Sequence, residues 1–97
     1  MSYPSLKNKK LFDAILKLKN TQEAAKFFRD LLTLAEIEDF STRLSVAKLL
    51  NENKYSYEQI AKICHVSTTT VTRVSHWLHH GMGGYKLILK RISSNKK

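Results

Sequence analysis

The sequence predicts an all-α protein of six helices in a single domain that spans residues 1–97. Apolar residues recur at intervals of three and four along most of the chain, which is the spacing of one face of a helix. No segment has the alternation expected of a strand, and no repeat or low-complexity linker divides the chain. All three glycines fall between residues 81 and 84 and the only proline is at position 4, so these residues interrupt none of the first five predicted helices.

Charge is distributed unevenly along the chain. The formal net charge is +9, and residues 67–97 contain six lysines and arginines but no acidic residue. Residues 1–19 carry five lysines and one aspartate, whereas residues 20–52 carry six acidic and four basic residues. Concentrated positive charge favours a polyanionic partner. Charge alone leaves open the alternative of ordinary solvated lysines.

Cysteine content and hydropathy indicate the compartment. Cys64 is the only cysteine, which excludes an intramolecular disulfide and fits a reducing cytoplasm. No apolar run approaches the roughly 18 residues that a membrane span needs, and the polar start of the chain lacks the core of a signal peptide. We therefore expect a soluble, cytoplasmic protein in which Cys64 is packed rather than reactive.

The first two predicted helices cover residues 7–19 and 21–32. In the first, Leu11, Ile15 and Leu18 form an apolar stripe that ends near residues 19–20. The second carries more apolar surface than two short helices can cover. This surplus predicts a core against the third helix or against a second subunit, and it consists of Ala24, Phe27, Phe28, Leu31 and Leu32.

The third predicted helix is the longest. Thr33 is followed three residues later by Glu36, which is a complete capping box. Apolar residues then continue at helical spacing to Leu50, and the polar segment 51–53 ends the helix.

Residues 56–79 predict two short helices joined by a tight turn. Ser56 can cap the first helix and Ser67 the second, because their hydroxyls can accept bonds from unpaired backbone N–H groups. His65 stands where many helix-turn-helix sequences have a left-handed glycine, a conformation that histidine tolerates comparatively well. Small Ala61 lets the two helices cross closely. A glycine-rich hinge then leads to a last helix near residues 84–92 and to a frayed basic tail at 93–97.

Short polar residues and an arginine fill the exposed side of the second helix of this pair. Such a row is typical of a helix that reads the major groove of DNA. We expect Lys62, Arg73 and the C-terminal lysines to bind phosphates, and residues 67–70 to approach base edges. The candidate DNA-binding residues are Ser56, Lys62, Ser67, Thr68, Thr69, Thr70, Thr72 and Arg73.

Two alternatives to DNA binding remain open. The pair could be an ordinary helical hairpin with solvated threonines, or a module that binds another protein. A protein-binding helix more often exposes aromatic or aliphatic anchors, and residues 68–70 offer none. RNA binding is a third possibility, although aromatic side chains suited to base stacking are few.

The sequence contains little that predicts catalysis. No glycine-rich loop follows a strand, so a phosphate-binding loop is not expected. His76 and His80 have the spacing of a helical metal pair, but no acidic residue or cysteine near them completes a site. We expect no enzyme activity, no metal and no cofactor.

Three segments together resemble the Trp repressor superfamily, and in particular its small Gram-positive members. They are the Leu-Leu-Thr box at 31–33, the Ser-Thr-Arg pattern at 41–43 and the Thr-Val-Thr-Arg sequence at 70–73. The resemblance implies six helices, an intertwined homodimer and DNA reading by the fourth and fifth helices. Helices at about 7–52 and 84–92 would form the dimer. The resemblance also implies that the protein is a transcription regulator, which we expect to be a repressor.

The resemblance further implies a possible ligand pocket around Arg43 and Arg73, with Thr33 as another pocket residue. Two departures stand in this pocket, because Val74 replaces a small glycine and Trp77 replaces a serine. We expect Val74 and Trp77 to fill the cleft between the arginines, which makes tryptophan an improbable effector. Alternatively, one arginine is a surface or interface cation and the other a phosphate contact.

Overall fold

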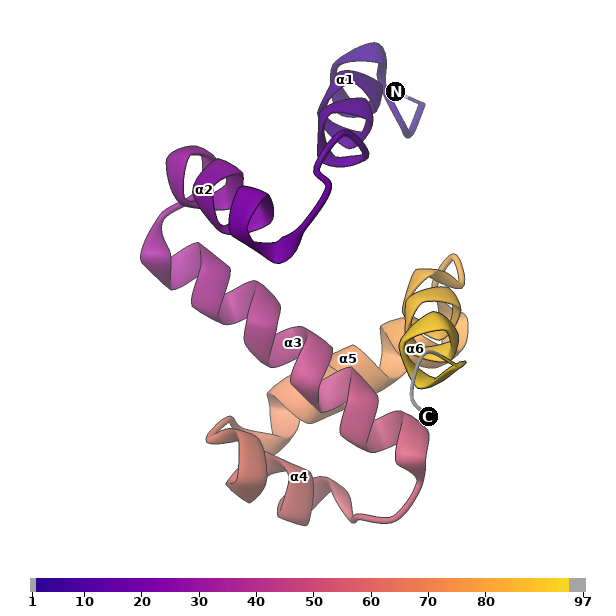
Figure 1. Ribbon diagram of the computed structural model, residues 1–97. Helices are drawn as coiled ribbons and strands as arrows, with labels where there is room; N and C mark the ends of the chain where they lie inside the picture. The colour runs from indigo at the N-terminus through magenta and orange to yellow at the C-terminus, as the bar shows by residue number, and fades with distance from the viewer. Residues whose placement is uncertain (1, 95–97) are drawn as a thin grey trace. The chain divides into compact units, whose positions relative to one another are not determined.

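The computed structural model describes residues 2–94, which form six α-helices and no strand, as the sequence predicts (Figure 1). None of these helices is both long enough and apolar enough to cross a membrane. The helices are α1 (Leu6–Ile15), α2 (Thr21–Leu31), α3 (Leu34–Glu52), α4 (Tyr57–Cys64), α5 (Thr68–His80) and α6 (Gly84–Ser94).

The chain divides into two compact units, and the boundary between them along the chain falls between Ile37 and Glu38. The first contains α1, α2 and the first turn of α3. No residue of α1 or α2 is buried. Phe27 and Phe28, half-buried, stack edge to face with their ring centroids 5.5 Å apart. Within the described residues, the apolar side chains expected to be in surplus on α2 are at most half-buried.

Helix α1 ends at Ile15, four residues before the predicted end. The next helix is capped by Asn20, whose Oδ1 accepts a 2.9 Å bond from the Glu23 N–H. This cap requires an extended backbone at Asn20, with φ −158° and ψ 173°. The chain must leave the helical conformation before residue 20, so the cap of α2 shortens α1.

The predicted start and end of α3 are confirmed. The Thr33 Oγ1 accepts a bond from the Glu36 N–H at 3.1 Å, and the Glu36 carboxylate accepts one from the Thr33 N–H at 2.9 Å. At the other end, the helix stops at Glu52 and Asn53 adopts a left-handed conformation with φ 57°.

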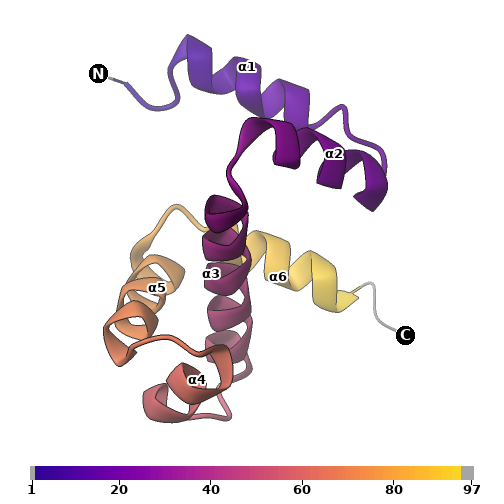
Figure 2. The same ribbon diagram turned by 90° about the vertical axis from the view of Figure 1, so that its left-hand side faces the viewer.

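The second unit has a core to which four helices contribute (Figure 2). Its fully buried large side chains are Val46 of α3, Ile60 of α4 and Val71 of α5. Ala61, 8% exposed, is the small residue at the crossing of α4 and α5. The remaining buried apolar residues of this core are Ala47, Val74, Leu78 and Leu89.

The α4–α5 connection forms as predicted. The Gln59 N–H donates to Ser56 Oγ at 3.1 Å, and the Thr70 N–H donates to Ser67 Oγ at 3.1 Å. Between these caps, His65 takes the left-handed conformation with φ 57° and ψ 46°. The turn needs only three residues, so the start of α5 is held close to the end of α4.

Helix α5 ends where a side chain can no longer fit. A Cβ at Gly81 would collide with the backbone carbonyl oxygen of Trp77. Gly83 has φ +87°, which also favours glycine. The last helix begins at Gly84 as predicted but extends to Ser94. Residues 93 and 94 therefore belong to α6 and not to the expected tail, whose residues 95–97 lie outside the described part.

Candidate nucleic-acid interface

The first turn of α5 presents two exposed threonines whose hydroxyls are free. Thr68 and Thr69 are both exposed, and neither hydroxyl makes a hydrogen bond within residues 2–94. A threonine hydroxyl can donate and accept, and its methyl group can contact a thymine methyl. These two side chains are therefore chemically suited to touch the edges of bases.

The other hydroxyls of the predicted reading surface already have partners. Ser67 Oγ accepts from the backbone of Thr70 and lies 3.2 Å from the Thr70 hydroxyl. The Thr72 hydroxyl donates to the Thr68 carbonyl at 3.0 Å. Ser56 Oγ caps α4. These groups shape the helix starts, while Thr68 and Thr69 remain available.

The two predicted phosphate-binding cations of the helix pair are exposed. Lys62 lies on α4 and Arg73 on α5, and both side chains are exposed. Neither forms an ion pair with another described residue. Cations without an anionic partner in the protein can form charge-assisted hydrogen bonds to an external anion such as a phosphate.

Buried contacts and one hydrogen bond hold α5 in place. Val71, Val74 and Leu78 of α5 pack into the core of the second unit. The Tyr57 hydroxyl at the start of α4 lies 2.6 Å from Ser75 Oγ on α5. The reading surface is thus carried by a helix that is anchored along its opposite side.

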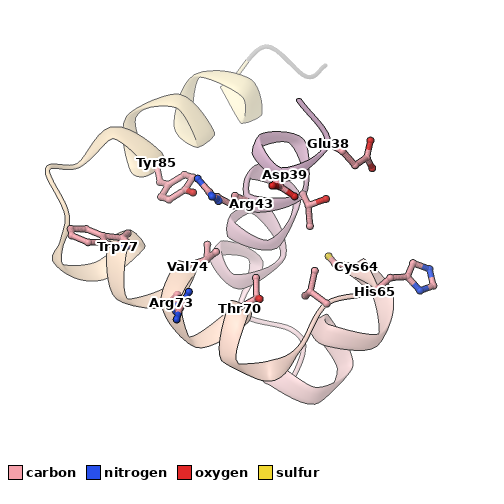
Figure 3. Close-up of a pocket in the computed structure, with 12 residues that line it drawn as sticks. Glu38, Asp39, Arg43, Cys64, His65, Thr70, Arg73, Val74, Trp77 and Tyr85 are labelled. Atoms are coloured by element: carbon pink, nitrogen blue, oxygen red, sulfur yellow. The ribbon is translucent and has the colours of Figure 1, made fainter. Parts of the chain in front are cut away.

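A cleft of about 830 Å³ opens beside α5 (Figure 3). It brings together Arg43 of α3 and Arg73 of α5, and Val74 and Trp77 also line it. The complete lining consists of Glu38, Asp39, Thr42, Arg43, Cys64, His65, Val66, Thr70, Arg73, Val74, Trp77 and Tyr85.

The expectation that Val74 and Trp77 fill this cleft is wrong in the structure of the single chain. Val74 is buried at 4% exposure, but Trp77 is 59% exposed and lies on the wall of an open space. The reason is helical geometry. Val74 shares the buried stripe with Val71 and Leu78, at spacings of three and four, whereas Trp77 is one position before Leu78 and points away from that stripe.

Thr33 belongs to the first unit, where its hydroxyl caps α3. The other four residues of the suggested pocket, Arg43, Arg73, Val74 and Trp77, line the cleft of the second unit.

Four charged side chains of the cleft form no ion pair with one another. Glu38 and Asp39 of α3 contribute negative charge to the cleft, and Arg43 and Arg73 contribute positive charge. The Arg43 guanidinium lies 5.6 Å from the centroid of the Phe40 ring, a cation–π distance. The cleft thus offers both signs of charge beside the aromatic side chains of Trp77 and Tyr85.

Cysteine and histidine chemistry adds no second site. Burial raises the pKa of the Cys64 thiol, which favours its protonated form over the reactive thiolate. The rings of His76 and His80 lie 5.3 Å apart between centroids. Within residues 2–94, however, no three histidine, cysteine or acidic side chains are grouped so as to hold a metal ion.

Sequence reasoning did not identify Glu38, Asp39 and Tyr85 as cleft residues. Asp39 precedes Arg43 by four positions, so helical spacing could have placed both on one face. Tyr85 comes from α6, and no local pattern connects it with α3. The Tyr57–Ser75 bond likewise joins residues 18 positions apart.

Comparison with known proteins identifies relatives over most of the chain. Residues 7–93 match the family model described as Trp repressor protein. The chain is 37% identical over 86 residues to protein YerC of Bacillus subtilis (strain 168). The aligned segment covers 89% of this chain and 82% of YerC.

Two crystal structures are also similar. One is a TrpR-like protein from Eubacterium eligens ATCC 27750, with TM-score 0.88, 38% identity, and coverage of 97% of this chain and 96% of that one. The other is a candidate Trp repressor from Staphylococcus aureus, with TM-score 0.85 and 39% identity. The match covers 96% of this chain and 92% of that one. The six helices, the cleft with its two arginines and these matches lead to one conclusion. The protein belongs to the Trp repressor family and has the all-α fold of that family.

Proposed function

We propose that the protein is a homodimeric transcription regulator that binds DNA sequence-specifically and acts as a repressor. The observation that carries this proposal is the first turn of α5, where Thr68 and Thr69 are exposed with free hydroxyls. Membership in a family of regulators supports it.

The helix pair α4–α5 acts as a helix-turn-helix. The N-terminal turn of α5 enters the major groove, and Thr68 and Thr69 touch base edges there. Ser67 and Thr70 approach the same bases, but their hydroxyls are already bonded to each other at 3.2 Å and keep less freedom to read. The Ser56 hydroxyl accepts a bond from the Gln59 N–H and keeps its own proton for a phosphate. The Thr72 hydroxyl, also predicted to contact a phosphate, already donates its proton to the Thr68 carbonyl, so the proposal keeps only Ser56 of these two contacts.

Phosphate contacts come from the cations around this surface. Lys62 and Arg73 neutralise phosphates on either side of the groove, and the lysines of the C-terminal part extend the contact. Residues 67–97 contain no acidic side chain that would oppose this binding. These contacts position the protein and make its affinity depend on salt, whereas base contacts determine which sequence is bound.

A second copy of the chain covers the apolar surface that this chain leaves open. Leu31 and Leu34 are 47% and 64% exposed, and Leu87 and Ile88 of α6 are 52% and 43% exposed. Since α1 and α2 contain no buried residue, their apolar side chains need another surface. Pairing of two chains supplies it and presents two copies of α5 to two half-sites.

The proposed regulator does not need tryptophan. Val71, Val74 and Leu78 anchor α5 in a core built from the protein's own side chains, which supports the reading helix. A ligand controls binding only if it has different affinities for two arrangements of the protein. The cleft remains available to another small molecule, which the regulator does not require for DNA binding.

Selection from a random pool of duplex DNA tests the proposal. The expected result is enrichment of a two-fold symmetric sequence, bound with an affinity that falls steeply with salt. The slope should be about −0.9 in log affinity against log salt for each phosphate contacted. The substitution Thr69→Ala should shift the enriched sequence, and Asp13→Ala, on a helix outside the helix pair, is the control. Recovery of no enriched sequence would favour a protein-interaction module instead.

A further inference from the structure

Tyr57 and Ser75 form a side-chain contact between α4 and α5 that the proposed function has not used. The Tyr57 hydroxyl and Ser75 Oγ are 2.6 Å apart, a short distance for two hydroxyls. Tyr57 is the first residue of α4, and Ser75 lies in the second half of α5. No other side chain–side chain hydrogen bond is recorded between these two helices in residues 2–94.

The surroundings of the bond give it weight. Ser75 is buried at 7% exposure and is the polar residue of the described core. Within its own helix, a serine hydroxyl can also bond to a backbone carbonyl one turn earlier. Removing the partner of a largely buried hydroxyl costs free energy, because little water reaches the group to replace that partner.

The apolar core and the hydrogen bond constrain the helix pair in different ways. Ile60 and Ala61 of α4 belong to the same core as Val71 and Val74 of α5, and the hydrophobic effect that drives their burial is non-directional. A hydrogen bond is directional and short. Since Ser75 lies six positions after Thr69 on the same rigid helix, fixing Ser75 also fixes the direction in which Thr69 points.

We propose that Tyr57 is a positioning residue for base recognition, which acts through its hydrogen bond to Ser75. The bond holds α5 at one rotation and tilt relative to α4, so that Thr68 and Thr69 meet base edges while Lys62 meets the backbone. This inference rests on the proposed DNA binding. It assigns Tyr57 no contact with bases.

The consequence is a separation between affinity and specificity. Phosphate contacts tolerate a small rotation of α5, because long cationic side chains can follow the backbone. Base contacts tolerate it less, since their hydrogen bonds are directional. Loss of the Tyr57–Ser75 bond should therefore reduce the preference for the selected sequence more than it reduces general DNA binding.

The test compares Tyr57→Phe, Ser75→Ala and the double variant with the unaltered protein. The readout is the ratio of affinities for the selected duplex and for a scrambled duplex, measured where all variants are folded. Each single substitution should lower this ratio by roughly 3- to 10-fold, and the double variant should fall no further. Tyr55→Phe is the matched control, because Tyr55 is 40% exposed, similar to the 41% of Tyr57, and has no hydrogen-bond partner among the described residues.

The results separate this inference from the proposed function. If Tyr57→Phe changes the ratio no more than Tyr55→Phe does, or if the two single effects simply add, Tyr57 is not a positioning residue. If the unaltered protein binds no duplex, the proposed function is wrong. The orientation of α5 relative to α4, measured by residual dipolar couplings of backbone amides, then decides. A changed orientation in both Tyr57→Phe and Ser75→Ala, but not in Tyr55→Phe, supports the positioning bond, and an unchanged orientation overturns it.

Discussion

Two isoleucines of α4 provide a direct test of the core beneath the reading helix. Ile60 is fully buried at 0% exposure, and Ile63, on the same helix, is 52% exposed. The change Ile60→Ala removes three carbon atoms from a packed site and leaves a cavity, which costs about 2–5 kcal/mol. The same change at Ile63 removes atoms that are half in water, so its cost should be near 1 kcal/mol.

These costs are large relative to the stability of a chain of this size. A protein of 97 residues has a free energy of unfolding of about 5–15 kcal/mol. Each kcal/mol lowers the melting temperature of a small domain by roughly 4–8 °C. We therefore expect Ile60→Ala to lower Tm by at least 10 °C, and Ile63→Ala to lower it by roughly 5 °C.

Circular dichroism at 222 nm during heating measures both effects. All samples need the same protein concentration, because the melting of a dimer depends on concentration. Equal shifts for the two variants would refute the assignment of Ile60 to the core and with it the anchoring of α5. A larger shift for Ile63→Ala would place α4 with its other face toward the core.

Three further predictions concern DNA, assembly and the effector. Arg73→Ala should weaken binding to selected and scrambled duplexes alike and reduce the salt slope by about 0.9. Thr69→Ala should instead cost about 1–3 kcal/mol of binding free energy on the selected sequence alone. Equal effects of both variants on every duplex would contradict the assignment of Arg73 to phosphates and Thr69 to bases. Sedimentation equilibrium at micromolar concentration should give a dimer, and Leu31→Glu should shift it toward monomer; a stable folded monomer of the unaltered chain refutes the assembly. L-Tryptophan at millimolar concentration should leave DNA affinity unchanged, because Val71, Val74 and Leu78 already anchor α5 in the core; a rise in DNA affinity on addition of tryptophan would falsify this.

Local signals in the sequence predicted the helix starts well. The caps at Thr33, Ser56 and Ser67 depend on a side chain and a backbone group three residues away, and a sequence displays such spacings directly. The left-handed turn at His65 followed from its place between two capped helices. The end of α1 was missed because the cap of the next helix at Asn20 was not predicted.

Contacts between distant segments were predicted less well. Four residues of the suggested pocket do line one cleft, but the exposure of Trp77 depends on which way one helix face turns within the packed unit. The pairing of Tyr57 with Ser75 depends on the crossing of two helices, which periodicity alone does not specify. Which residues touch DNA stays a prediction.

The arrangement of hydroxyls at the start of α5 has an evolutionary consequence. The Ser67 side chain caps the helix, so the side chains of the two residues after it are not needed to start the helix. Under the proposed DNA reading, substitutions at Thr68 and Thr69 would change which operator is recognised without altering where the helix starts or what it packs against. Gene duplicates could acquire new targets through these two codons while the scaffold stays intact. The same two positions are the place to begin when retargeting the protein by design.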